Sequence, residues 1–323
     1  MTHIQTTWRW TWLARACAAA GWCCGLLLLG AAPALGAEPL QVVAGPSSIA
    51  VQAGDRPVLE YQFTENPAKP YLAKLFTPAG VNVLRDSPAD HKHHHGLMFA
   101  VAVDGVDFWS ENEKCGRQKH AGGETPTSRT VGEVEVALGT QQIDWVAPDG
   151  KLLMREARTV GVCRPPQSEA TLVGWQSRLE TPPGKDAITL SGSPYFGLGV
   201  RFVQSMDKGG KFQNADGKTG VAGTNDVRSA WCAYTASAEG KPVTVAIFDD
   251  PRNPRHPATW FTMDQGFAYL AATLNLSQQP LRIEAGKPLV LRYGVALWDG
   301  EVAKAKIDAL GERIARWSAE RKP

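Results

Sequence analysis

Four histidines lie within five positions of one another in the segment His91-Lys92-His93-His94-His95. Imidazole is the side chain whose ordinary pKa lies between pH 5 and 8, and it is the commonest metal ligand in proteins. Burying such a cluster without a function is costly, because charged rings repel one another and each neutral ring needs hydrogen-bond partners. The cluster therefore predicts the edge of an active site, with His91, His93 and His94 as candidate catalytic residues.

Two kinds of chemistry fit this cluster. If the segment is extended, His91, His93 and His95 share one face of it, and His94 points to the other. Imidazoles on one face can bind a divalent metal such as copper, zinc or manganese, and a neighbouring carboxylate can add an oxygen ligand. Without a metal, the rings provide a general acid and a general base near neutral pH. The sequence leaves both uses open, so no cofactor is certain and a divalent metal is an alternative; the carboxylates that could join it are Asp86 and Asp90.

A second candidate segment is the proline-rich stretch from Asp249 to Pro257. Its prolines restrict the backbone of a loop that otherwise consists of hydrogen-bond donors and acceptors, and a rigid loop can preorganise a polar ligand site. We expect His256 to act in catalysis, and Asn253 and Arg255 to bind substrate hydroxyls or a carboxylate.

Further candidates lie between and beside these segments. His120 follows a short basic segment and is a further candidate catalytic residue; with His91 and His93 it also makes a candidate set of metal ligands. Aromatic faces are large apolar contact surfaces, so tryptophans beside the polar loops are expected to form a wall on which a sugar ring stacks. The remaining substrate-binding candidates are Arg85, Asp107, Trp109 and Trp260.

Several familiar catalytic motifs are absent from the sequence: it has no Gly-x-Ser-x-Gly, no P-loop, no dinucleotide-binding glycine motif and no His-Glu-x-x-His. Hydrolysis of a glycosidic bond needs two carboxyl groups at a particular spatial separation, which a sequence does not show. The carboxylates that could serve are Asp107, Glu156, Glu180 and Asp249.

The pattern of apolar residues predicts an all-β protein. Apolar and polar residues alternate over 58–63, 130–136 and 243–248, which indicates strands with one buried face. Asp104-Gly105 lies between two short apolar runs and predicts a hairpin. Many short strands separated by turns favour a large β-sandwich or supersandwich.

One α-helix is expected at the C-terminus. Apolar residues recur at three- and four-residue steps over 302–317, behind a predicted cap at Asp299 or Gly300. This spacing is typical of an amphipathic helix that packs on a sheet.

Residues 1–37 are expected to be a signal peptide. Two arginines precede an apolar run from Ala16 to Leu35, and small residues follow it. An uncleaved anchor is the alternative, because the run is nearly long enough to span a bilayer. Cleavage predicts a periplasmic or secreted protein of residues 38–323, folded as a single domain and with no membrane span in the mature chain.

The composition of the mature chain limits its partners. Two of the 34 basic residues and none of the 32 acidic residues lie in 1–37, so the remaining chain is formally neutral. Neutrality argues against a nucleic-acid partner held by phosphate contacts. Three cysteines remain, Cys115, Cys163 and Cys232. They allow one disulfide at most, and burial as small apolar side chains fits equally well.

These motifs resemble a bacterial family described as methane oxygenase PmoA-like and treated as a domain of unknown function. The shared pieces span nearly all of the mature chain: Lys69-Pro70-Tyr71-Leu72 with 77–80, Asp90-His91 with His93-His94, 105–109, Gly116-Arg117 with His120, 250–257 with Trp260, and Leu291-Arg292-Tyr293 with 299–300. The family pattern has proline at position 92 and arginine at position 95, where this chain has Lys92 and His95, so His95 is left out of the predicted site. The resemblance implies a supersandwich similar to galactose-mutarotase-like domains, and relatives in polysaccharide or sugar-oxidation systems.

The sequence thus predicts an exported enzyme that acts on a carbohydrate or sugar derivative by histidine-based acid/base chemistry, as an epimerase, lyase or hydrolase does. Its partner is a small-molecule or glycan substrate. The segments around His91–His94, His120 and Asn253–His256 are expected to gather at one end of the sheets. Two alternatives stay open: a metal-dependent enzyme that uses the histidine cluster, and a non-catalytic glycan-binding module.

Overall fold

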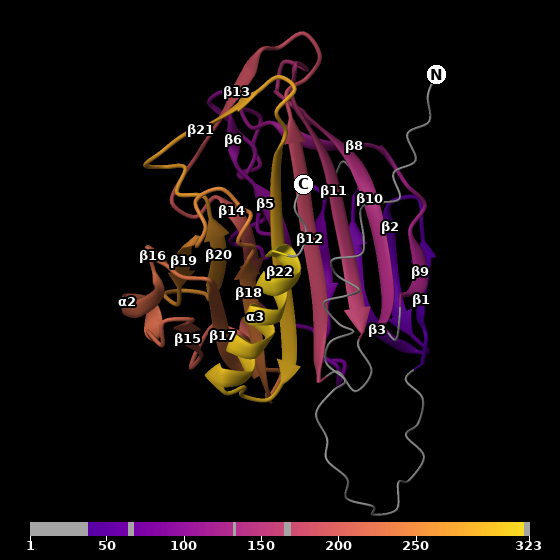
Figure 1. The fold of residues 1–323 in the computed structure, drawn as a ribbon, viewed down its shortest axis with the longest axis vertical. Helices are drawn as coiled ribbons and strands as arrows, with labels where there is room; N and C mark the ends of the chain where they lie inside the picture. Colours follow the sequence, from indigo (N-terminus) through magenta and orange to yellow (C-terminus); the bar gives the residue numbers. More distant parts are fainter. Residues whose placement is uncertain (1–37, 64–67, 132–133, 165–168, 320–323) are drawn as a thin grey trace, which may run out of the picture.

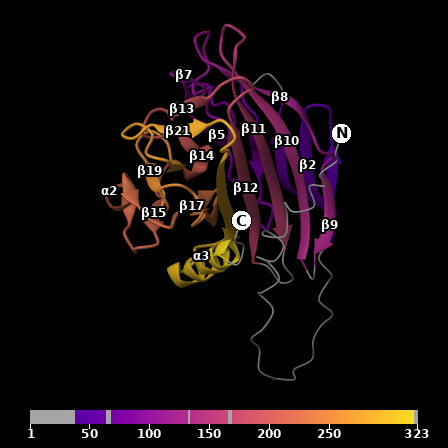
Figure 2. The same cartoon turned by 45° about the horizontal axis from the view of Figure 1, so that its top comes forward.

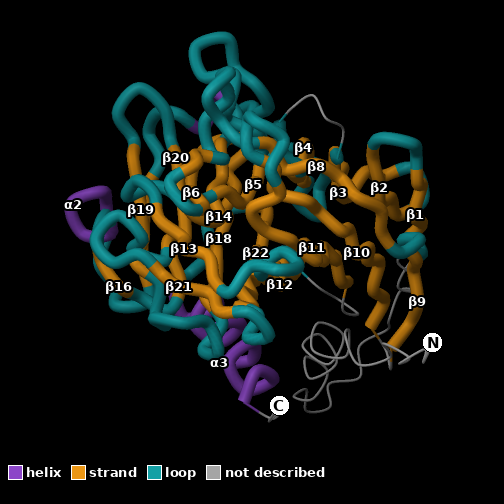
Figure 3. The backbone as a smooth tube through the Cα atoms, turned by 90° about the horizontal axis from the view of Figure 1, so that it is seen from above, coloured by secondary structure: helices purple, strands orange, loops and turns teal. Residues whose placement is uncertain are grey.

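The computed structural model describes residues 38–63, 68–131, 134–164 and 169–319. Within them, two nine-stranded sheets lie face to face, as Figure 1 shows from the side and Figure 3 from above. None of the helices in this part of the chain is long and apolar enough to cross a membrane. The predicted signal peptide, residues 1–37, lies outside the described residues.

The first sheet runs in the order β1-β2-β3-β4-β5-β14-β20-β19-β16, and neighbouring strands are antiparallel. It combines the N-terminal strands with strands from the second half of the chain. Its members are β1 (Leu40–Ala44), β2 (Ser48–Ala53), β3 (Arg56–Gln62), β4 (Tyr71–Leu75), β5 (Leu97–Ala100), β14 (Gly197–Arg201), β16 (Val227–Arg228), β19 (Thr259–Met263) and β20 (Tyr269–Thr273).

The second sheet runs in the order β15-β17-β18-β22-β12-β11-β10-β8, and β9 also pairs with β10. It contains the longest strands of the described chain. Its members are β8 (Arg117–Gly123), β9 (Thr127–Val131), β10 (Val134–Val146), β11 (Leu152–Arg164), β12 (Ala170–Glu180), β15 (Lys211–Asn214), β17 (Trp231–Ala238), β18 (Lys241–Asp249) and β22 (Leu289–Asp299).

A small third sheet, in the order β21-β13-β6-β7, covers one end of the sandwich. The remaining elements are short except for the C-terminal helix. They are β6 (Ala102–Val103), β7 (Val106–Asp107), β13 (Ala187–Ser191), β21 (Leu281–Glu284), the 3₁₀ turn η2 (Gln204–Met206), α2 (Gly220–Thr224) and α3 (Lys304–Ala319).

The β-sandwich predicted from the sequence is confirmed, and so are most of its local elements. The alternating segments 58–63 and 243–248 fall in β3 and β18. Asp104 and Gly105 form the turn between β6 and β7, with φ values of 48° and 83°. Positive φ at both central residues is what a type I′ hairpin requires.

One predicted strand is wrong. The alternating segment 130–136 is divided between β9 and β10, and Val131 pairs with Val134 in an antiparallel ladder. The chain therefore reverses within the segment, because a polar-apolar alternation continues across a tight hairpin as readily as along one strand.

The predicted C-terminal helix is confirmed as α3, but its start is not. Asp299 ends β22 and accepts hydrogen bonds from Thr77 Oγ1 and the Ala79 backbone N–H. The helix begins only at Lys304, and its buried Ile307 packs on the second sheet. Figures 1 and 2 show α3 (yellow) over the β17–β18–β22 part of that sheet, away from β9 and β10.

The core between the sheets contains a buried ion pair as well as apolar side chains. Arg158 and Glu156 of β11 both have fully buried side chains, and Arg158 Nε donates to Glu156 Oε1 at 2.7 Å. Glu156 also accepts hydrogen bonds from Trp145 Nε1 and Ser177 Oγ, on the two neighbouring strands. Glu156 is thus a structural residue inside the sandwich, so its predicted role as a catalytic carboxylate is wrong.

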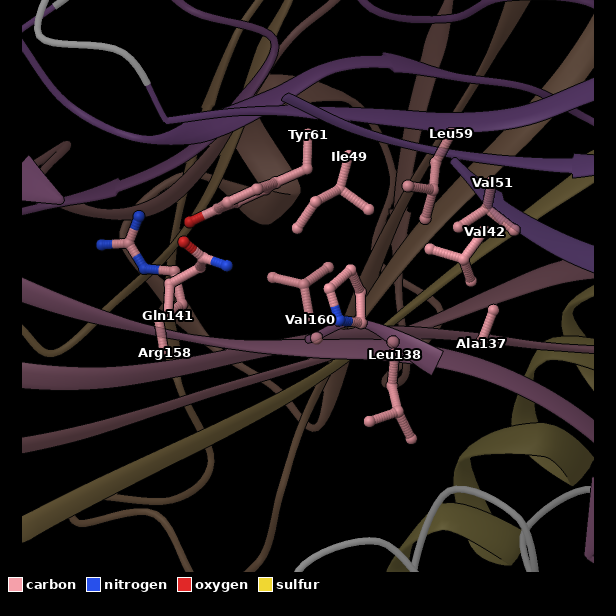
Figure 4. A pocket seen from close by; sticks show the side chains of 13 residues that line it. Val42, Ile49, Val51, Leu59, Tyr61, Ala137, Leu138, Gln141, Arg158 and Val160 are labelled. Atoms are coloured by element: carbon pink, nitrogen blue, oxygen red, sulfur yellow. The ribbon is translucent and has the colours of Figure 1, made fainter. Parts of the chain in front are cut away.

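Beside this ion pair the two sheets leave a small cavity, shown in Figure 4. Tyr61, Gln141 and Arg158 bring their polar groups to one end of it, and aliphatic side chains of β1–β3, β10 and β11 line the rest. Its volume of about 20 Å³ is little more than the space that one water molecule needs. It is a packing defect of the sandwich and not a substrate site.

The three cysteines of the described residues are buried thiols. In the described residues no disulfide joins Cys115, Cys163 and Cys232. Burial in place of a bridge was one of the two possibilities that the sequence allowed.

The ion pair leads to a stability prediction. Glu156→Gln keeps the size of the side chain but leaves the Arg158 charge buried without a counter-charge, so we expect a loss of about 3–5 kcal/mol in the free energy of unfolding. Glu180→Gln is the matched control, because Arg178 and Glu180 are 34% and 42% exposed and exposed pairs contribute about 1 kcal/mol or less. Urea unfolding followed by tryptophan fluorescence measures both; equal losses would contradict the prediction.

Candidate functional site

The histidine cluster lies in the connection between β4 and β5, which hydrogen bonds tie to β14. The Gly96 N–H donates to Arg85 O, and the Arg201 N–H donates to Gly96 O. Gly96 has a φ of +27°, and a Cβ at this position would lie 2.0 Å from Leu72 O. Only glycine fits at this position, so Gly96 marks the point where the histidine loop ends and β5 begins.

The histidines occupy a turn, so the extended conformation under which His91, His93 and His95 would share a face does not apply. The His91 N–H donates to Pro88 O, and the His94 N–H donates to His91 O. The turn gathers three rings, whose centroids are 5.9 Å apart for His91–His93, 4.7 Å for His91–His94 and 4.6 Å for His93–His94. His95 points elsewhere, so the predicted shared face of His91, His93 and His95 is wrong.

Aromatic rings surround the three imidazoles. The Trp109 ring lies 4.9 Å from His93 and 5.1 Å from His94, and Phe267 lies 4.8 Å from His91. We call His91, His93, His94, Trp109 and Phe267 the histidine–aromatic cluster. Ring contacts extend it over the outer face of the first sheet through Tyr195, Phe196, Phe261 and Tyr269.

His95 is held between two carboxylates. Its Nδ1 lies 2.7 Å from Asp86 Oδ1, and its Nε2 lies 2.8 Å from Glu111 Oε1. Ionised carboxylates only accept hydrogen bonds, so both ring nitrogens must donate and the ring carries a positive charge. Lys69 Nζ also donates to Glu111, and Tyr71 OH donates to Asp86 at 2.8 Å. We call these five residues the His95 network.

The charges of the His95 network support one another. Burial opposes the charge on His95, but hydrogen bonds to Asp86 and Glu111 outweigh it and raise the pKa of His95 above its ordinary value. Burial likewise opposes the charges of the two carboxylates, but the hydrogen bonds from His95 hold both pKa values below the ordinary range. Lys69 is completely buried, and burial lowers its pKa although Glu111 offsets part of the effect.

The neighbouring imidazoles of His93 and His94 favour the neutral form, in contrast to His95. Burial, followed by electrostatic interactions with His93, His91, Arg201 and Lys69, lowers the pKa of His94 to about 3. Burial also lowers the pKa of the half-buried His93, followed by the charge of Lys69. Both rings are therefore neutral at pH 7 and available as proton acceptors.

Buried polar atoms at the histidine–aromatic cluster lack a hydrogen-bond partner among the described residues. They include His94 Nδ1 and Arg201 Nε. Each such atom costs stability, about 1–3 kcal/mol. A concentration of unsatisfied polar groups is typical of a functional site and not of a packing core.

Arg85 and Asp107, which the sequence predicted to bind substrate, also lie near this site. Arg85 NH1 lies 3.6 Å from Asp207 Oδ2, and Arg201, which also contacts Asp207, stacks 3.9 Å above the Phe267 ring. Asp107 Oδ1 accepts the backbone N–H groups of Trp109 and Ser110, so it shapes the turn that presents the indole.

His120 and Trp260 do not reach the histidine–aromatic cluster. His120 is exposed on β8, and its ring lies 4.6 Å from that of Phe63. Trp260 is 1% exposed, and its Nε1 donates to Ser229 O. Trp109 is also buried, so the predicted stacking wall of Trp109 and Trp260 is wrong; the partly exposed rings are Tyr195, Phe261 and Phe267.

The proline-rich loop lies elsewhere in the fold. Asn253 Nδ2 donates to Asp249 and to Arg292 O, and Arg255 donates to the carbonyl groups of Leu274, Gln279 and Pro280. Asn253 thus ties the loop to β22, and Arg255 ties it to the segment after β20, whereas the sequence predicted that both side chains bind substrate.

The three histidine segments therefore do not converge. The proline-rich loop enters β19 at Thr259, whereas Phe267 of the histidine–aromatic cluster follows the other end of β19 at Met263. Four strand steps separate these ends by about 13 Å. The predicted single site is wrong because the β19–β20 hairpin stands between its two halves.

In the described part of the chain, no group of three or more histidine, cysteine, aspartate or glutamate side chains is placed to hold a metal ion. His91, His93 and His94 present rings to one another, and Asp90 Oδ2 lies 3.0 Å from His91 Nδ1 without hydrogen-bond geometry. Asp86, the other predicted oxygen ligand, is occupied by His95, Tyr71 and Ser87.

Some residues of the site escaped the sequence analysis. Lys69 and Tyr71 belong to a motif of the family resemblance but were given no role, and His95 was set aside because it departs from the family pattern. Glu111 follows Trp109 by two positions without any motif. Nothing in the sequence pointed to Arg201, Phe267 and Tyr269, which long-range strand pairing brings to the cluster.

The opposite preferences of His94 and His95 can be measured directly. Imidazole ¹H–¹⁵N NMR spectra should show His94 neutral down to about pH 3 and His95 still protonated above pH 6.5. Below pH 6.5 the unfolded chain binds a proton at His94 that the folded chain does not, so His94 lowers the stability of the fold as pH falls. His95 has a raised pKa in the folded chain, so it contributes stability that is lost as pH rises through that pKa. Titration of both rings near pH 6.5 would contradict the described network.

Comparison with known proteins identifies the family but not the activity. No curated protein matches the chain. Solved structures with a similar fold include the galactosidase domain of the alpha-galactosidase–sucrose kinase AgaSK (TM-score 0.44, 8% identity, 80% of this chain and 42% of that one). Others are the GH36 alpha-galactosidase AgaA from Geobacillus stearothermophilus with raffinose (0.38, 9%, 81% and 41%) and a galactose mutarotase related enzyme from Lactobacillus acidophilus (0.38, 7%, 81% and 100%).

The chain spans about two fifths of the length of both galactosidases, and these likenesses concern the fold alone. The sequence itself matches one family over residues 48–312. The name PmoA-like stays a prediction from the sequence motifs. The chain belongs to the family of unknown function DUF6807.

Proposed function

We propose that this protein is an exported enzyme that transfers a proton on a carbohydrate or sugar derivative, with His93 as the proton acceptor. One observation carries the proposal: a half-buried imidazole is kept neutral beside an aromatic cluster and a buried Lys69–Glu111 ion pair. A general base must be unprotonated at the working pH and accessible to substrate. The lowered pKa and the partial exposure of His93 support this role.

The surrounding charges suit such a step. Burial and the positive charge of Lys69 lower the pKa of His93, so its ring is free to accept a proton, and the negative charge of Glu111 acts in the opposite direction. The Glu111 carboxylate therefore favours the imidazolium that forms when His93 accepts a proton. Tyr195, Phe261 and Phe267 are partly exposed around the cluster, so they provide the apolar faces on which a sugar ring would stack.

Two features of the proposal rest on the sequence. The apolar run within residues 1–37 supports export to the periplasm or beyond the cell. The motifs of the PmoA-like resemblance support a place in sugar metabolism. Of the two arginines predicted to bind substrate, Arg85 is the one near the histidine–aromatic cluster. It would orient a hydroxyl or carboxylate of the substrate.

We expect His93→Gln to lower turnover at least about 100-fold, because general-base catalysis contributes roughly 10²–10⁴ in rate. The assay is solvent deuterium exchange into C–H positions, followed by ¹H NMR over a panel of aldoses, uronates and keto-sugars. His120→Gln is the matched control, since His120 lies apart from the cluster. Equal exchange rates in wild type and His93→Gln would refute the role of His93.

The alternatives give different outcomes in the same experiment. A glycan-binding module binds a sugar without exchange, and its affinity survives His93→Gln but falls in Phe267→Ala. A metal-dependent enzyme contains near-stoichiometric copper, zinc or manganese that is lost in a His91→Ala/His93→Ala double variant. Mass spectrometry of untagged protein measures this content.

The pH dependence follows from the lowered pKa of His93. A base must be unprotonated, so its depressed pKa should keep kcat/KM constant as pH falls through 6.5, with the decline only at more acidic pH. The Lys69→Met variant removes a positive charge that lowers the pKa of His93, so it should move the acidic limb to higher pH. A limb centred at 6.5 in both proteins would contradict this assignment.

A further inference from the structure

A histidine–aspartate pair lies in the proline-rich loop, apart from the histidine–aromatic cluster. His256 Nδ1 lies 2.7 Å from Asp249 Oδ2, and Asp249 is 3% exposed. The carboxylate also accepts the Ala258 N–H at 2.9 Å and Asn253 Nδ2 at 2.7 Å. These contacts fix the ring: Nδ1 donates to Asp249, which leaves the lone pair of Nε2 as an acceptor for a ligand.

This ring borders a pocket of about 280 Å³ between α3 and strands β17 and β18. Trp231 and Phe248 form its wall on the sheet, and Ile314 and Ala315 form its wall on the helix. Trp231 is fixed because its Nε1 donates to Asp308 Oδ1 of the helix at 3.1 Å. We call this space the His256 pocket; it is mostly apolar with a few polar groups, as small-molecule sites commonly are.

The charged groups that line the pocket set the sign of its ligand. They are three carboxylates, Asp249, Asp308 and Glu312, and no lysine or arginine of the described residues lines it. Lys304 Nζ neutralises Asp308 at 2.7 Å from outside the pocket. Asp249 accepts hydrogen bonds from His256 Nδ1, the Asn253 side-chain amide and the Ala258 N–H. Its negative charge therefore makes the Nε2 of His256 a stronger hydrogen-bond acceptor. An anion would be repelled here.

We propose that the His256 pocket binds a small organic cation, a protonated amine on an apolar body. The ammonium group donates to His256 Nε2, and the apolar body packs between Phe248 and Ile314. Because the β19–β20 hairpin separates this pocket from the histidine–aromatic cluster, the site is independent of the proton transfer proposed for His93.

Benzylamine is the probe, with benzyl alcohol and benzoate as neutral and anionic ligands of matched shape. We expect benzylamine to bind saturably, benzyl alcohol at least about tenfold more weakly because a charged hydrogen bond is lost, and benzoate not at all. The readout is the indole N–H signal of Trp231 in ¹H–¹⁵N NMR spectra, assigned with Trp231→Phe. Equal binding of the three ligands, or no shift with benzylamine, overturns the proposal.

Variants locate the site. His256→Gln should weaken benzylamine at least about tenfold, since the imidazole acceptor is lost. Ala315→Phe fills the pocket from the half-buried helix face and should abolish binding, which keeps the test decisive if His256→Gln does not fold. His93→Gln should leave benzylamine affinity unchanged, so failure of the proposed proton transfer and failure of this pocket are distinguishable. Unchanged binding in Ala315→Phe refutes the location.

Discussion

The buried charge of Arg158 is the constraint on which the rest of the structure depends. Besides Glu156, its guanidinium donates to Pro70 O at 2.7 Å and to Gln118 Oε1 at 2.9 Å. It thus ties the middle of the second sheet to the segment that enters β4. The residues on either side of Pro70 are Lys69 and Tyr71, the two that bind the carboxylates of the His95 network. A buried ion pair contributes little net stability, but it strongly disfavours any packing that leaves it unpaired.

The site built on this anchor separates charge among adjacent residues. His95 carries its proton between Asp86 and Glu111, while His94 and His93 stay neutral against aromatic rings. The difference comes from their partners and not from their residue type. Carboxylates surround one ring, and apolar surface with nearby cations surrounds the others. A loop of four histidines can therefore present both a fixed cation and free bases at the same pH.

Local patterns predicted the local parts of the fold. Alternation revealed β3 and β18, Asp104-Gly105 revealed a hairpin, and periodic apolar residues revealed α3. The hairpin between β9 and β10 was missed, because the alternation does not change across it. The turn at the histidines was not predicted, because the hydrogen bonds that close it join backbone atoms and do not depend on residue type.

The site was only partly predictable for a related reason. The histidine cluster is visible in the sequence, but its partners come from distant segments: Glu111 is 42 positions from Lys69, and Phe267 follows a different strand altogether. Sequence proximity also misled, because the polar side chains of Asn253 and Arg255 donate to backbone carbonyl groups of Arg292 and Leu274, in other segments of the fold. The order of the strands in the first sheet brings these loops together, and the sequence does not show that order.

The β19–β20 hairpin has a consequence for how the protein can change. Phe267 of the histidine–aromatic cluster lies at one end of this ladder and the loop that carries His256 enters it at the other, and the two ends have different side-chain partners. Substitutions at sites that are far apart and share no partner have additive free energies. Side chains at one end can therefore be replaced without re-optimisation of those at the other.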